Sequence, residues 1–150
     1  MFGCNGRAVE DFGLEKLKVG ISTETDVRRE MGAPEKVWDE ADGSRTLEYP
    51  KGPEGHRTFM IHLDQQGIYQ SYRQVLTAKN FATMSVGMSQ DDIRRQLGKP
   101  RSIVHLALKN ETVWDWLYLD EGGAELLFNA HFDTNGKLVQ TSTSPLLPDQ

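Results

Sequence analysis

Two histidine–aspartate pairs at matching places along the chain are the residues best suited to proton chemistry. His62 precedes Asp64 by two residues, and His131 precedes Asp133 by the same spacing. Residues two apart in a β-strand project to one face, so each pair could orient a proton-transfer group. Each aspartate also begins a four-residue segment that ends in glycine, which is typical of a type I turn. We therefore predict turn-forming aspartates rather than a catalytic pair.

Other arrangements that carry chemistry are weak in this sequence. A single cysteine, Cys4, can form neither an internal disulfide nor a cysteine-based zinc site. The glycine pair Gly122-Gly123 lacks the pattern of a phosphate-binding loop. The four histidines show no metal-ligand spacing: His56, His62, His105 and His131. We predict that the protein is not an enzyme and uses no metal and no cofactor.

The composition favours a folded, water-soluble chain. Of 150 residues, 37% are hydrophobic and 26% are charged, and the mean hydropathy is −0.55. No run approaches the roughly 18 apolar residues of a membrane-spanning helix. A formal net charge of −5 argues against a nucleic-acid-binding surface, so the arginine pairs 28–29 and 94–95 are interpreted as a solvated face rather than a DNA-binding helix.

The chain contains a tandem repeat that covers most of its length. The spacing between equivalent residues falls from 67 to 66 inside the motif, which indicates one extra residue in the first copy. The matching segments are V-G-x-S at 19–22 and 86–89, V/I-R-R at 27–29 and 93–95, M/L-G-x-P at 31–34 and 97–100, LEY and WDW at 47–49 and 114–116, and H-x-D-x-x-G at 62–67 and 131–136.

Each copy of the motif predicts a short helix with both ends specified. Ser22 and Ser89 are the expected N-caps, and Gly32 and Gly98 are the expected C-terminal caps. Weaker helices are expected at 9–17 and 78–84, and strands at 45–49, 59–63, 68–76, 113–119, 127–132 and 137–142. The predicted fold is α+β, with two tandem repeats that each have two short helices followed by an antiparallel meander of three or four strands. The predicted regions are an N-terminal tail at 1–7, repeats at 8–76 and 77–143, and a C-terminal tail at 144–150.

Aromatic residues are the candidates for protein binding. They alternate along one predicted strand at Trp114, Trp116 and Tyr118, so their rings share a face, where core packing is the alternative role. Further rings could contribute to a sheet surface: Tyr49, Tyr69 and Tyr72. Large aromatic groups are common anchors of protein interfaces.

The repeated motif resembles the SmpA/OmlA (BamE-like) family of outer-membrane lipoproteins, over about residues 17–142. The resemblance lies in G-I/M-S, V/I-R-R and M/L-G-x-P, followed by an aromatic strand and a D-x-x-G hairpin. Two such units in one chain are also similar to the tandem architecture of the beta-lactamase inhibitory protein (BLIP). This resemblance implies a lipid-anchored module on the periplasmic face of the outer membrane, one that binds other envelope proteins and performs no chemistry.

The first four residues, Met1 to Cys4, are similar to the end of a bacterial lipobox. The resemblance implies acylation of Cys4 in the native precursor, whereas the chain as given is expected to be soluble. A free cysteine in a tail is the alternative. We expect an envelope scaffold or modulator, in outer-membrane protein assembly or envelope integrity, with the outer-membrane assembly machinery among its partners. The alternative function is an inhibitor-type binder of a periplasmic enzyme.

Overall fold

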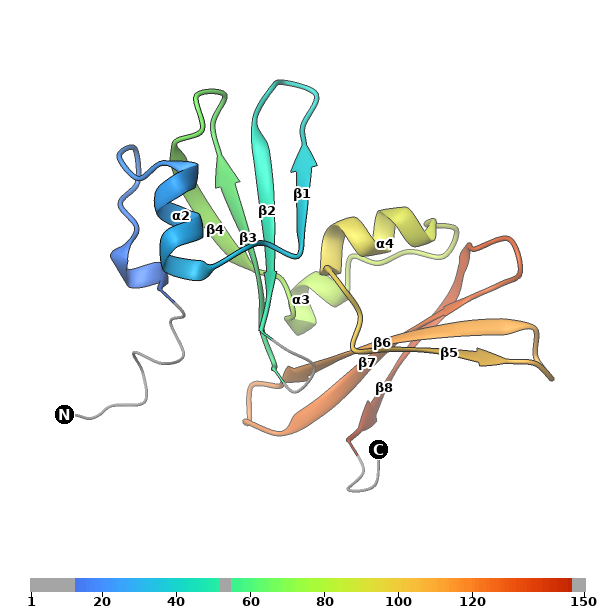
Figure 1. The fold of residues 1–150 in the computed structure, drawn as a ribbon. Coiled ribbons are helices and arrows are strands. Elements are labelled where there is room, and N and C mark those ends of the chain that lie inside the picture. The colour runs from blue at the N-terminus through green and yellow to red at the C-terminus, as the bar shows by residue number, and fades with distance from the viewer. Residues whose placement is uncertain (1–12, 52–54, 147–150) are drawn as a thin grey trace. The chain divides into compact units, whose positions relative to one another are not determined.

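The computed structural model describes residues 13–51 and 55–146 and shows an α+β protein with two antiparallel four-stranded sheets (Figure 1). The described residues divide into two compact units. The first contains the chain up to Tyr49 together with Phe59–Arg73, and the second contains the described part of Pro50–Thr58 and the chain from Gln74 onward. Each sheet is a meander, because every strand pairs with its neighbour in the sequence.

The elements follow the same order in both units. In the first unit they are a 3-10 helix η1 (Leu14–Lys16), α2 (Glu24–Met31), β1 (Lys36–Asp39), β2 (Arg45–Pro50), β3 (Thr58–Leu63) and β4 (Tyr69–Gln74). In the second they are α3 (Ala78–Phe81), α4 (Gln90–Leu97), β5 (Ser102–Leu106), β6 (Glu111–Leu119), β7 (Glu125–Phe132) and β8 (Leu138–Pro145). The strands β1 and β5 were not among the individual strands predicted from the sequence.

The first helix of each unit is shorter than predicted. Of the helix expected at 9–17, residues 9–12 lie outside the described residues, and only Leu14–Lys16 forms a helical turn. The helix expected at 78–84 ends at Phe81, and Thr77 caps it by accepting a hydrogen bond from the Asn80 N–H. Within the described ranges, no helix is long and apolar enough to cross a membrane.

The helices α2 and α4 begin with the same reciprocal pair of cap hydrogen bonds. Ser89 is the N-cap of α4, as predicted, and its side chain accepts from the Asp92 N–H at 3.0 Å. The N-cap of α2 is Thr23, which accepts from the Asp26 N–H at 3.2 Å, so the prediction of Ser22 was wrong. Ser22 is instead buried one residue earlier, where its Oγ accepts from the Lys18 N–H.

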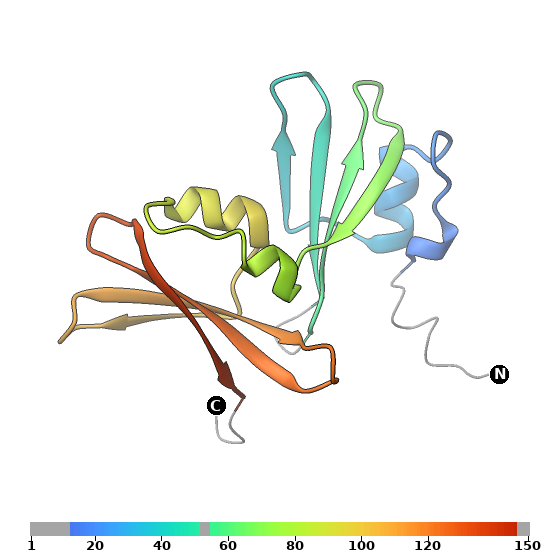
Figure 2. The same ribbon diagram turned by 180° about the vertical axis from the view of Figure 1, so that it is seen from behind.

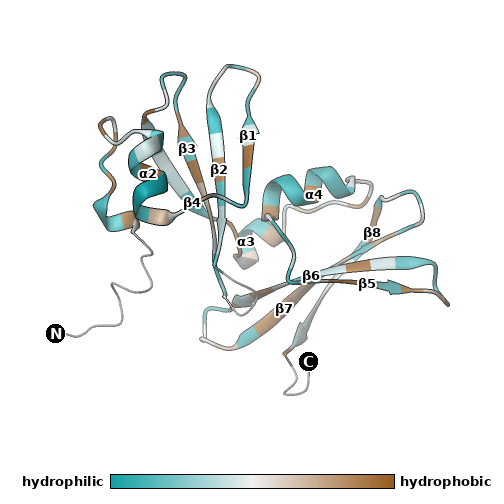
Figure 3. Cartoon of the chain, viewed as in Figure 1, coloured by the Kyte–Doolittle hydropathy of each residue, from teal (hydrophilic) through white to brown (hydrophobic). Residues whose placement is uncertain are grey.

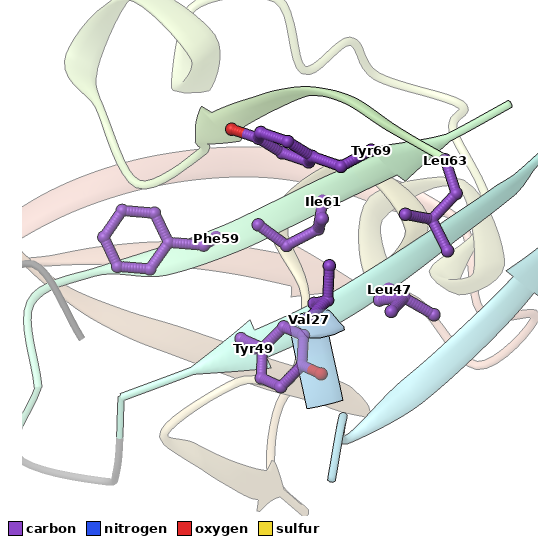
Figure 4. Packing of buried hydrophobic residues seen from close by; sticks show 7 residues of the cluster. All are labelled: Val27, Leu47, Tyr49, Phe59, Ile61, Leu63 and Tyr69. Atoms are coloured by element: carbon purple, nitrogen blue, oxygen red, sulfur yellow. The ribbon is translucent and has the colours of Figure 1, made fainter. Parts of the chain in front are cut away.

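A helix covers the inner face of the first sheet. Figure 4 shows Val27 of α2 among side chains from three strands of that sheet. This cluster consists of Val27, Leu47, Tyr49, Phe59, Ile61, Leu63 and Tyr69. In Figure 3, β3 and β7 carry apolar segments, whereas α2 and α4 are largely hydrophilic. Burying the single apolar stripe of α2 on the sheet therefore helps to hold the helix in place.

In the second unit α3 and α4 lie along one face of the sheet β5–β8 (Figure 2). Phe81 of α3 stacks on Phe128 with ring centroids 4.1 Å apart, and its ring meets the edge of Tyr118 at 4.7 Å. The helix α4 contributes the fully buried Ile93 and Leu97. The rings of Trp116, Tyr118 and Phe128, which point to this side, are therefore core residues.

Candidate functional site

Four of the six aromatic residues proposed for protein binding are buried in the cores of their own units. Tyr49, Tyr69, Trp116 and Tyr118 are each at most 5% exposed. The core-packing role therefore holds for these four, because their strands turn the ring-bearing face toward the covering helix. This corrects the expectation that they form an exposed surface.

The other two aromatic candidates keep some exposure. Tyr72 of β4 is 50% exposed, and its ring meets Phe59 edge-on at 6.0 Å. Trp114 is half-buried, with its ring centroid 4.9 Å from that of Phe132. The two residues belong to different units, Tyr72 to the first and Trp114 to the second. Cys4 lies outside the described residues.

The aspartates of the two histidine–aspartate pairs form turns, as predicted. The Asp64 Oδ1 accepts from the N–H groups of Gln66 and Ile68, and the Gly67 N–H donates to the Asp64 carbonyl. Asp133 accepts in the same way from the N–H groups of Asn135 and Lys137. Each carboxylate is thus engaged by backbone N–H groups of its own turn.

The second sheet has a face opposite α3 and α4 that carries a connected set of polar side chains. Because side chains alternate along a strand, residues between the core positions point to this side. We call it the open face and define it by Ser102, Val104, Glu111, Val113, Asp115, Asn129, His131, Gln140, Ser142 and Ser144. All of them except Asp115 are half-buried or exposed, whereas Leu117 and Leu127, which the same alternation places farther along this face, are buried. Sequence reasoning missed this set because its members come from four strands.

His131 lies at the centre of the open face. Its Nδ1 is 3.2 Å from the Glu111 Oε1, and its Nε2 is 3.1 Å from the Ser142 Oγ. The Asn129 amide donates to the Oγ atoms of both Ser142 and Ser144. These bonds cross β6, β7 and β8 and tie the surface side chains of three strands into one row.

The order serine, histidine and carboxylate is that of a nucleophilic triad, so its chemistry must be considered. Acyl transfer also requires hydrogen-bond donors placed where the oxyanion develops. Ser142 is paired with Asn129 in the β7–β8 ladder, whose register shifts only between His131 and Phe132, and the Asn129 amide donates to the serine itself. The row therefore fits an ordered polar surface better than a nucleophilic site.

A second polar cluster joins β5 to β6. The Arg101 guanidinium forms two bonds to the Asp115 carboxylate, at 2.8 and 3.0 Å. The Ser102 hydroxyl donates to the same carboxylate at 2.7 Å. Asp115 is 8% exposed, so these bonds satisfy a nearly buried charge and fix the position of β5.

The second unit also has a pocket of about 380 Å³. Its walls mix basic side chains such as His56 and Lys79, acidic ones such as Asp120 and Glu121, and the apolar Leu119. This mixture converges on no single ligand chemistry. In the part of the chain that the structure describes, no group of three or more histidine, cysteine, aspartate or glutamate side chains could hold a metal ion.

No protein-family model matches the sequence, and no curated protein matches it. Solved structures give distant likenesses. The "putative beta-lactamase inhibitor protein" of Streptococcus mutans is 15% identical, with a TM-score of 0.37 and coverage of 92% of this chain and 98% of that one. The DUF4309 family protein YjgB of Bacillus subtilis is 14% identical, with a TM-score of 0.32 and coverage of 87% and 82%.

A third solved structure, an extracellular protein containing an SCP domain from Bacillus anthracis, is 12% identical with a TM-score of 0.33. The match covers 91% of this chain and 52% of that one. At these values none of the three structures assigns the chain to a family.

Proposed function

We propose that the protein is a non-enzymatic, protein-binding component of the bacterial cell envelope, and that the open face of the second unit is its binding surface. In this proposal the chain consists of two SmpA-like repeats in a BLIP-like tandem. It is anchored through Cys4 to the periplasmic side of the outer membrane and acts on other envelope proteins as a scaffold or modulator. The repeated motif supports the resemblance to the SmpA-like family, and the lipobox-like segment Met1 to Cys4 supports the anchor.

The observation that supports the binding surface is the hydrogen-bonded row around His131. Side chains on a protein surface normally lose rotational freedom when a partner binds, which weakens the complex. Here Glu111, Asn129 and Ser142 are already held by bonds to their neighbours while remaining half-buried or exposed. A partner could therefore bind this face at a lower entropic cost than it would pay on an unordered surface.

Site-specific crosslinking in cells tests the proposal. A photoreactive residue at Gln140 projects from the open face, and the same residue at Thr141 projects from the other side of the same strand. Both positions are exposed, so they form a matched pair. The gene is expressed with its native upstream codons in a Gram-negative host, and crosslinked partners are identified by mass spectrometry.

We expect an envelope protein to be crosslinked from Gln140 and not from Thr141. A component of the outer-membrane assembly machinery would support the scaffold function, whereas a soluble periplasmic hydrolase would favour the inhibitor-type alternative. Crosslinking from Thr141 alone, or from neither position, would contradict binding at the open face. A separate assay with an activated ester tests the absence of catalysis, because hydrolysis that disappears in Ser142→Ala would show an enzyme.

A further inference from the structure

The edge strand β5 exposes apolar side chains on both faces of the second sheet. Ile103 is 59% exposed and Val104 is 48% exposed, and as neighbours in a strand they project to opposite sides. Leu108, in the turn that follows β5, is fully exposed. The segment Ser102–Leu106 contains neither proline nor any lysine, arginine, aspartate or glutamate. Edge strands with these properties pair readily with another strand.

The other three sheet edges in the described residues are protected. The strand β1 carries the charged Lys36 and Asp39 in four residues. The strands β4 and β8 are each covered at their start, because the Gly20 N–H donates to the Tyr69 carbonyl and the Gly87 N–H to the Leu138 carbonyl. The strand β8 is otherwise rich in serine and threonine and ends in proline. The apolar edge is thus specific to β5.

We propose that β5 pairs in antiparallel fashion with β5 of a second copy of this chain. Two identical strands related by a two-fold axis must share one central residue, and Val104 is the middle residue of β5. Every pair in this register joins residues of the same sheet face. The pairs are Val104 with Val104, Ile103 with His105, Ser102 with Leu106, and Arg101 with Ala107.

This register is chemically self-complementary. A β-branched pair lies at the centre, and such cross-strand pairs stabilise antiparallel sheets. The segment 101–107 has one permanent charge, on Arg101, and Asp115 of the same chain already binds that guanidinium. Two copies therefore bring no unpaired like charges together. A partner strand bearing acidic or basic residues would gain nothing here, which favours a second copy over a charged peptide.

Pairing at β5 would join two four-stranded sheets into one continuous sheet of about eight strands. Because the two-fold axis is normal to the sheet, both open faces would lie on the same side. The inference does not depend on the proposed function, since self-association can be measured without any partner.

Sedimentation equilibrium of the full chain over a range of concentrations tests the inference, with a reducing agent present so that Cys4 cannot crosslink. We expect a monomer–dimer equilibrium for the native sequence. The variant Val104→Lys places two ammonium groups opposite each other and should weaken the dimer by about tenfold or more. The matched control is Val139→Lys, because Val139 is an exposed valine on the opposite edge strand, β8.

The dimer should persist in Val139→Lys, and circular dichroism should show that both variants are folded. A chain that is monomeric at every concentration would overturn the inference, as would a dimer disrupted by Val139→Lys and not by Val104→Lys. The register is tested by Val104→Cys in a Cys4→Ser background. Oxidation should then give a covalent dimer through residue 104, whereas Leu108→Cys in the same background should not, because the two copies of residue 108 lie at opposite ends of the strand pair.

Discussion

The two units hold their main helix against the sheet with the same bond, made by different chemical groups. In the first unit the Tyr49 hydroxyl donates to the Gly32 carbonyl at 2.8 Å. In the second, Trp116 Nε1–H donates to the Gly98 carbonyl at 3.1 Å. Both glycines end the helix with a positive φ, at 87° and 81°. The position and the bond are retained, while the side chain that provides the donor differs.

The solvent-facing residues of the two units differ much more. On the first unit, Arg45 joins Glu24 to Asp39 in a cluster of exposed or half-buried charges. On the second, a nearly buried aspartate joins β5 to β6, and a histidine-centred row crosses the open face. The shared bonds maintain the fold of each copy. The two copies therefore differ mainly in the polar contacts that they carry toward solvent.

Removing the ring of Trp116 should have the largest effect. Trp116 is 1% exposed and also makes the bond to Gly98, so Trp116→Ala should lower the free energy of unfolding by about 3–5 kcal/mol. Urea unfolding followed by circular dichroism measures the change. Trp114→Ala, on the same strand and half-buried, should cost clearly less. Equal losses in the two variants would contradict the role given to Trp116.

The ion pairs of the two units should differ in strength. Asp115→Ala should lower the free energy of unfolding by about 2–3 kcal/mol, because it leaves a largely buried Arg101 without its carboxylate. Asp39→Ala should cost less than about 1 kcal/mol, since the Asp39 side chain is 76% exposed. Urea unfolding of both variants in low and high salt gives the comparison. A larger loss of unfolding free energy in Asp39→Ala than in Asp115→Ala would contradict this ranking of the two ion pairs.

The donor that bonds to the end of α2 is the Tyr49 hydroxyl, which can ionise. The corresponding donor in the second unit is the Trp116 indole N–H, which does not. Burial raises the pKa of Tyr49 from 10.0 to about 12. The stability that comes from the protonated hydroxyl should therefore be complete below pH 10 and should be lost as the pH rises through 12. Tyr49→Phe should cost about 0.5–1.5 kcal/mol at pH 7 and should lose less stability on going to alkaline pH.

Urea unfolding at pH 7 and pH 11 measures this difference. Burial also raises the pKa of Tyr69, so the variant should retain part of the alkaline loss. An unchanged alkaline loss in Tyr49→Phe would show that Tyr49 does not contribute to it.

The helix caps should give small effects that are equal in the two units. Thr23→Ala and Ser89→Ala each remove one cap hydrogen bond and should each cost about 1 kcal/mol. This corresponds to a fall of about 2–4 °C in Tm for a chain of this size. Thr25→Ala, in the exposed first turn of α2, is the control and should change Tm little. A large effect in only one unit would show that the two helices differ in tertiary support.

The sequence predicted the parts of the fold that depend on neighbours in the chain. Ser89 was identified as a cap from its residue type, and its bond to the Asp92 N–H spans only three residues. Ser22 was chosen wrongly because the repeat alignment paired it with Ser89, whereas in the structure the residue equivalent to Ser89 is Thr23. The strands β1 and β5 were missed because four or five residues after a proline give too short a pattern to identify.

The candidate surface could not be predicted, because its contacts join residues distant in sequence. Glu111 and Ser142 lie 20 and 11 residues from His131. Only the register of β6, β7 and β8 brings them together. The aromatic residues of β6 show the same limit of sequence reasoning. Their alternation in the sequence predicts that the rings share one face, but only the packing of α3 and α4 shows that this face is the core.

The sequence by itself determined the tandem repeat, the helix ends at Gly32 and Gly98, and the turns at Asp64 and Asp133. The helix ends and the turns depend on bonds that span at most four residues, so the residue types suffice to specify them. Only the tertiary structure decided which sheet face is covered, which side chains bond to His131, and which edge strand is left apolar and open. Those outcomes depend on how strands pair and which face a helix covers, and the energy of both comes from burying groups that the sequence does not place next to each other.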